Sequence, residues 1–292
     1  MYKKSLFLLA IFILFANVCF AGGNHEVLKI EEVLVKGDSL TIGDGNRFEQ
    51  YQAEIEDLYV ACYEFSWEQF AFVANYGLTH KQLELRETAL YPLVGINANH
   101  SSLILDIKKN AEYVSLSDGR IVVVNGAENQ PVRNISWYGA ALFCNILSEI
   151  NNYKPCYNIT DSAIWSIDEK ADGYRLPSFD EWEYIAGGGQ LSEGFTYAGS
   201  DDAEEVGWFV TNSGGKPHPV GMLKPNELGI YDLNGNVHEF CTEINKALLL
   251  KGAALTAENR IWRGGAYKSA IVDRYHFTQN PNFPDFLYPF DD

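Results

Sequence analysis

The sequence predicts a single α+β domain that is rich in loops, with short sheets and two or three helices. Three observations support this fold class. Serine capping signals mark three helices, and short alternating apolar runs mark strands near the N-terminus. The remainder is rich in Gly, Asn, Pro and aromatic residues, which is typical of ordered loops and not of a simple layered fold.

The composition excludes several classes of protein. The 292 residues are 47% hydrophobic, which is ordinary for a globular chain and argues against general disorder. Acidic residues number 39 and basic residues 22, so the net charge is −17 and the isoelectric point is near 4.7. We therefore expect no nucleic-acid partner and no docking on an anionic membrane surface.

Residues 1–21 are expected to be a signal peptide, followed by one domain over 26–292. Two early lysines precede an apolar run of 11 residues at 6–16, and Ala21 is a suitable cleavage residue. The run is shorter than the roughly 20 residues that span a bilayer, so we expect an exported protein without a transmembrane span after cleavage. A retained anchor and a lipid on Cys19 are the alternatives.

Local patterns place the first elements. Apolar and polar residues alternate through 27–43 around Gly37–Asp38, which predicts a β-hairpin, and 59–63 predicts another strand. Ser66 with Gln69 forms a capping box, so a helix should begin there and stop at Gly77.

The segment 78–130 is polar and irregular, with one expected strand at 120–124. A second helix should follow Ser136, where apolar residues recur at helical spacing. A third should follow Ser178, whose capping box uses Glu181, and the glycines 187–189 should end it.

The chain has five cysteines, and Cys19 lies in the expected leader. The other four, Cys62, Cys144, Cys156 and Cys241, allow three disulfide pairings. No CxxC pair and no His/Cys cluster with zinc spacing occurs. We expect buried thiols or one or two disulfides, and the pairing stays open.

Four segments carry a family resemblance. They are LYVACYEFS at 58–66, PVRNISWY at 131–138, GYRLPSFDEWEY at 173–184, and HPVG…NELGIYDLNGNVHEF at 218–240, which ends in WRGG at 262–265. In this order they resemble the sulfatase-modifying-factor family, also called the formylglycine-generating-enzyme family. The resemblance implies the variant of the C-type lectin fold found in that family, in one domain with short twisted sheets.

The resemblance also implies where copper chemistry would reside. True enzymes of the family hold Cu(I) with two cysteines after the Arg-Gly-Gly strand, and these positions are Ser269 and Arg274 here. In this chain Ala266 replaces the active-site serine of the family, His238 replaces its tryptophan, and no cysteine follows Cys241. We therefore expect no copper, no catalytic residues and a non-catalytic domain.

The alternative is a metal-dependent oxidoreductase of the same family that acts on a sulfur-containing substrate through a histidine site. The six histidines are scattered in sequence, and His238-Glu239 is no HExxH motif because position 242 is threonine.

Calcium is the cofactor that the resemblance favours. In calcium-binding relatives the segment from 232 to 239 resembles an ion site, which here would use the carboxylates of Asp232 and Glu239 and the carbonyls of Gly235 and Val237. The alternative is a Gly-Asn turn held by hydrogen bonds alone. A purely structural role, with calcium locking the loops, is a third reading of the whole chain.

The C-terminal loops are the expected ligand face, because the same region forms it in several lectin-like relatives and because aromatic and hydrogen-bonding residues mix there. The partner would be a protein or a glycan, bound alone or within an envelope or surface assembly. The expected ligand-binding residues are Trp208, His238, Tyr267, Lys268, Ser269, Arg274, Tyr275 and His276.

Overall fold

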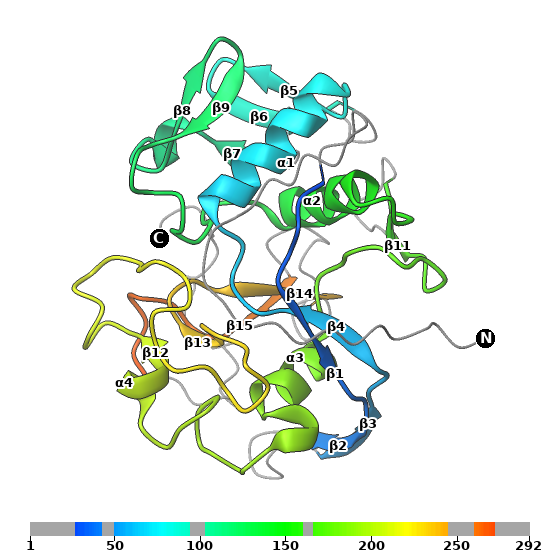
Figure 1. The fold of residues 1–292 in the computed structure, drawn as a ribbon, viewed down its shortest axis with the longest axis vertical. Helices are drawn as coiled ribbons and strands as arrows, with labels where there is room; N and C mark the ends of the chain where they lie inside the picture. Colours follow the sequence, from blue (N-terminus) through cyan, green and yellow to red (C-terminus); the bar gives the residue numbers. More distant parts are fainter. Residues whose placement is uncertain (1–26, 43–49, 94–102, 160–165, 245–259, 272–292) are drawn as a thin grey trace, which may run out of the picture.

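A computed structural model describes residues 27–42, 50–93, 103–159, 166–244 and 260–271. It has two lobes, each with its own core (Figure 1). The upper lobe holds α1, α2 and β5–β9, and the lower lobe holds α3, α4 and β12–β15. The mixture of short helices and short sheets confirms the predicted α+β class.

The α-helices are α1 Trp67–Thr79, α2 Trp137–Ile150, α3 Phe179–Ala186 and α4 Ala203–Val206, with 3₁₀ turns η2 Lys108–Asn110 and η3 Gly189–Leu191. The strands are β1 Glu32–Val35, β2 Ser39–Ile42, β3 Tyr51–Glu54, β4 Leu58–Ala61, β5 Leu83–Arg86, β6 Ala89–Pro92, β7 Leu105–Asp106, β8 Val114–Ser117, β9 Arg120–Val123, β10 Tyr157–Asn158, β11 Ser166–Ile167, β12 Gly207–Trp208, β13 Asn234–Gly235, β14 Glu239–Ile244 and β15 Arg260–Arg263.

The predicted hairpin at 27–43 is wrong in its pairing, although both strands exist. β1 pairs with β4 and β2 pairs with β3, both antiparallel and in one continuous register. The break falls at Gly37, whose missing Cβ would lie 2.0 Å from the Ile55 carbonyl oxygen. Gly37 is therefore needed for close contact between two long bent strands and does not form a tight turn.

The helix starts are confirmed. Both predicted capping boxes form, with Ser66 and Gln69 before α1 and with Ser178 and Glu181 before α3, and Ser136 caps α2. α1 runs to Thr79 and does not stop at Gly77. A Cβ at Gly77 would lie 2.8 Å from a methyl group of Leu83, so this glycine serves packing inside the helix.

The segment from 78 to 130 contains more structure than predicted. Besides the expected β9, it forms β5, β6, β7 and β8. Asp118 and Gly119 both have positive φ in the turn between β8 and β9, as the two-residue hairpin turn requires. Buried Trp67, Phe70 and Val114 belong to the core that these strands share with α1 and α2.

Cys62, Cys144 and Cys156 are free thiols, and Cys62, Cys156 and Cys241 are buried. Of the two expectations, buried thiols fit and disulfides do not. Within the described residues, no helix is long and apolar enough to cross a membrane. The expected signal peptide lies outside the described residues.

Candidate functional site

The turn at Asn236 holds together the segments of the predicted ligand face. Asn236 is fully buried with φ +54°, and its backbone N–H donates to the Trp208 carbonyl (2.9 Å) while its carbonyl accepts from the Tyr267 N–H (2.8 Å). Its side chain donates to Glu64 (2.7 Å) and to the carbonyl of His218 (3.1 Å), and it accepts from the His218 N–H (2.9 Å). One residue thus fixes four segments that are distant in sequence.

The glycine before it permits this approach. Gly235 has φ +73°, and a Cβ there would lie 2.1 Å from the Trp208 carbonyl oxygen. Its N–H donates to the Gly264 carbonyl at 2.7 Å, which joins the parallel β12–β13 pair to the end of β15. A side chain at this position would separate the three segments.

Two of the predicted calcium ligands are desolvated carboxylates of this turn. Burial raises the pKa of Asp232 to about 6, against the opposing hydrogen bond from the Gly221 N–H (2.6 Å). Burial likewise raises the pKa of Glu239 to about 7, although its carboxylate accepts from the Trp182 indole N–H, and the nearby Asp232 raises it further.

A third carboxylate, Glu64, was not predicted. Burial raises its pKa well above the ordinary value, and the charges of Asp232 and Glu239 raise it further. Glu64 accepts from Asn236 and from the Val237 N–H (3.1 Å). The signal was present in the first motif, where an acidic residue stands inside an otherwise apolar segment, a pattern typical of a buried hydrogen-bonding role.

The donor set suits a hard cation. Carboxylates that raise one another's pKa are stabilised when a divalent ion neutralises them, and calcium prefers oxygen ligands. Throughout the described ranges, however, no group of three or more His, Cys, Asp or Glu side chains is arranged to hold a metal ion. The predicted site would therefore depend on two carboxylates, Asp232 and Glu239, and on the carbonyls of Gly235 and Val237.

The structure brings together only part of the predicted ligand face. Trp208 stacks on His218, with ring centroids 3.8 Å apart. Tyr267 is 2% exposed, and its hydroxyl accepts from Arg133 at 2.5 Å, so its ring is packed inside and is not presented to a ligand. Lys268 is exposed.

Ser269, which the resemblance places at the first copper-cysteine position, shapes a turn. Its hydroxyl accepts from the Ala266 N–H (3.1 Å), and its carbonyl accepts from the Val210 N–H (3.0 Å). The predicted Arg274, Tyr275 and His276 lie outside the described residues.

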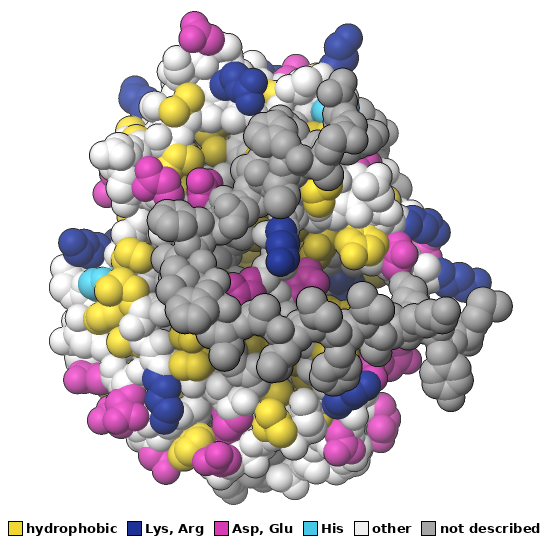
Figure 2. Space-filling model, in the orientation of Figure 1, with side chains coloured by type: hydrophobic (Ala, Val, Ile, Leu, Met, Phe, Trp, Pro, Cys, Tyr) yellow, Lys and Arg dark blue, Asp and Glu magenta, His cyan; other side chains and the backbone are white. Residues whose placement is uncertain are grey.

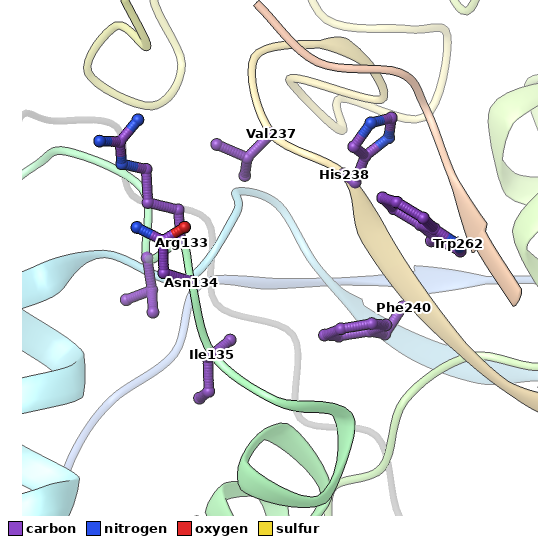
Figure 3. Close-up of a pocket in the computed structure, with 8 residues that line it drawn as sticks. Arg133, Asn134, Ile135, Val237, His238, Phe240 and Trp262 are labelled. Carbon is purple, nitrogen blue, oxygen red and sulfur yellow. The ribbon is translucent and has the colours of Figure 1, made fainter. Parts of the chain in front are cut away.

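His238 lines a pocket between the lobes, and Trp208 is not among the residues that line it (Figure 3). Its ring meets Trp262 edge to face, with centroids 4.5 Å apart. The lining is mostly apolar and comes from the loop before α2, from the start of β14 and from β15. The lining residues are Val132, Arg133, Asn134, Ile135, Val237, His238, Phe240 and Trp262.

Arg133 and Asn134 were not predicted as site residues. The Arg133 side chain is 13% exposed, forms an ion pair with Glu112 (2.8 Å) and bonds Tyr267. Asn134 is 8% exposed with φ +55° and donates to Asn110 at 3.0 Å. Both stand in the second motif, in which polar residues interrupt an apolar approach to a helix.

The comparisons agree with this architecture. The family model described as the sulfatase-modifying factor enzyme 1-like domain matches residues 22–285. A chaperone protein, LppX, of Paenibacillus barcinonensis is 30% identical, over 93% of this chain and 90% of the relative. The formylglycine-generating enzyme of Streptomyces coelicolor is 27% identical, over 56% of this chain and 51% of the relative.

Two solved structures share the fold. CarF superposes with a TM-score of 0.61 at 22% identity, covering 87% of this chain and 94% of that one. Treponema denticola variable protein 1 superposes with a TM-score of 0.56 at 21% identity, covering 85% and 87%. On the family-model match over most of its length, this chain belongs to the family of sulfatase-modifying factor enzyme 1-like proteins.

Proposed function

We propose that the chain is an exported, non-catalytic member of this family that binds a protein ligand. The observation that carries the proposal is the state of position 269. A serine hydroxyl there already accepts a hydrogen bond within its own turn, and no thiol follows Cys241. A pair of soft ligands for Cu(I) is therefore missing, while the backbone frame around the position is intact.

A protein ligand is favoured over a glycan by the relative named a chaperone, which aligns over almost the whole of both chains. The surface is compatible with this choice. Acidic side chains gather at the lower end of the face in Figure 2, over the lobe that carries α3 and α4. Such a surface disfavours polyanions and favours a partner that is neutral or basic.

In the test, the mature chain, residues 22–292, is immobilised. Exported proteins from the same organism are denatured and then passed over it while they refold. Wild-type protein should retain one or a few of them, and Lys268→Glu on the proposed face should reduce the retained amount. Lys170→Glu, an equal charge change at another exposed lysine, is the matched control. Binding on a glycan array without protein capture would make the ligand a glycan, and conversion of a cysteine peptide to formylglycine would overturn the non-catalytic assignment.

Calcium is proposed as the structural ion of the Asn236 turn. The support is the set of desolvated carboxylates, whose raised pKa values a divalent cation would lower. Millimolar Ca²⁺ should raise the melting temperature of the chelator-treated protein, and Mg²⁺ should raise it less because magnesium keeps its own water shell. Glu239→Gln should remove the difference between the two ions. Equal melting temperatures with and without Ca²⁺ would contradict the proposal.

A further inference from the structure

The pocket between the lobes contains a buried acceptor, the side-chain oxygen of Asn134, that no described residue satisfies. Asn134 donates its amide N–H to Asn110, and this bond fixes which way the amide is turned. Its carbonyl oxygen, Oδ1, is buried and has no hydrogen-bond partner among the residues that the structure describes. Figure 3 shows this oxygen on the side of the amide that faces the pocket. Leaving a buried acceptor unpaired is costly, so the site is suited to receive a donor.

The walls define what can carry that donor. Phe240 and Trp262 are cross-strand partners on β14 and β15, and together with Ile135 and Val237 they make an apolar lining. The cavity is about 60 Å³, well below the roughly 150 Å³ of a cavity that holds benzene, so only a small group fits.

Charge narrows the choice further. Arg133 also lines the pocket, and its positive charge disfavours an ammonium or guanidinium group as the donor. Its two terminal nitrogens are paired with Glu112 and with the Tyr267 hydroxyl, and its Nε is buried with no partner among the described residues. A carboxylate could accept a hydrogen bond from this Nε, but it has no hydrogen to donate to Asn134 Oδ1. The remaining class is an uncharged N–H or O–H donor on a small apolar group.

We propose that this pocket binds a secondary amide of a polypeptide, with Asn134 Oδ1 accepting the N–H and the apolar walls receiving the adjoining small group. The proposal rests on the proposed protein-binding function and names the chemistry that the site reads. A peptide N–H next to a small aliphatic side chain offers one neutral donor and one apolar body, which match Asn134 Oδ1 and the apolar lining.

The test compares two small amides that differ in the donor. N-methylacetamide has one N–H, and N,N-dimethylacetamide has none. Each is titrated into the ¹⁵N-labelled mature chain, and the indole N–H signal of Trp262 is followed. N-methylacetamide should shift this signal saturably and bind about tenfold more tightly, because the other amide leaves the acceptor buried and unpaired.

Two variants and one matched control separate recognition from folding. Asn134→Gly keeps the positive φ and removes the acceptor, so the affinity ratio of the two amides should fall to about one. Ile135→Phe should fill the cavity and abolish binding of both, whereas Val122→Phe, at an exposed position on β9, should change neither.

Equal affinities in the wild-type protein, or an unchanged ratio in Asn134→Gly, would overturn the inference. If an exported protein is captured and the amides are not distinguished, the pocket inference fails and the proposed function stands. If the amides are distinguished and no protein is captured, the proposed function and the polypeptide occupant both fail.

Discussion

Replacing Asn236 by glycine tests whether one side chain holds the ligand face together. Glycine accepts the backbone angle of φ +54° more easily than any other residue, so the substitution removes only the hydrogen bonds of the side chain. Three hydrogen bonds are lost, one to Glu64 and two to the backbone of His218. Asn236 is fully buried, so water has little access to replace the hydrogen bonds that Glu64 and the His218 backbone lose.

The expected cost follows from those bonds. Each bond contributes about 1 kcal/mol net, and partners left unpaired add to this, so we expect a loss of about 3–5 kcal/mol. Asn236→Ala should cost about 1 kcal/mol more, because alanine is disfavoured at positive φ. For a domain of this size the glycine variant should melt roughly 10 °C lower.

Chemical denaturation and the melting temperature provide the assay. Asn152→Gly is the matched control, because Asn152 also has positive φ (59°) but is exposed on the surface after α2. It should change the free energy of unfolding by less than about 0.5 kcal/mol. A cost below about 1 kcal/mol for Asn236→Gly would refute the reasoning, and so would equal costs for the glycine and alanine variants.

Three further outcomes are expected. Glu183→Gln should cost about 3–5 kcal/mol in denaturant unfolding, because it removes the carboxylate charge that pairs with the buried Arg263, and Glu183→Leu with Arg263→Met should recover most of it. Burial raises the pKa of Cys62 to about 11 and of Cys144 to about 12, so an aromatic disulfide reagent at pH 8 should label the native protein far more slowly than the unfolded one. Burial would raise the pKa of Glu181, but the hydrogen bonds from Arg175 outweigh burial and lower it. The stability that the ionised Glu181 carboxylate contributes is therefore present above the unfolded pKa near 4.5 and is lost as the pH falls through the lower folded pKa. Wild type and Glu181→Gln should converge in stability at low pH.

Local signals predicted the helices and several of the strands, but they did not predict how the strands pair. A capping box involves only four consecutive residues, so the motifs at Ser66 and Ser178 predict the starts of α1 and α3 from the sequence alone. Strand pairing depends on contacts between distant segments. β1 therefore pairs with β4, although β2 is its neighbour in sequence. β5 and β6 are four residues each, which is too short for a periodic pattern to identify them as strands.

The candidate site was predicted only as far as the motifs carried it. The resemblance pointed to Asp232 and Glu239, and both are desolvated beside the Asn236 turn. It pointed equally to Tyr267 as a ligand contact, and that residue is buried instead. The sequence shows that an aromatic residue is present in this loop. It does not show that the ring is turned inward by a hydrogen bond from Arg133, which lies 134 positions away in the chain.

The frame of the proposed ligand face is made mainly by backbone groups, so the proposed binding would not depend on the side chains that hold copper in the enzymes of the family. The Gly264 carbonyl, the Tyr267 N–H and the Ser269 carbonyl all bond to other segments through the main chain. Side chains at 266–269 can therefore change without removing those bonds, provided that Gly235 and Asn236 keep the turn to which they connect. Replacing two thiolates there would remove a metal site and leave these backbone bonds in place, which is compatible with the proposed role in recognition.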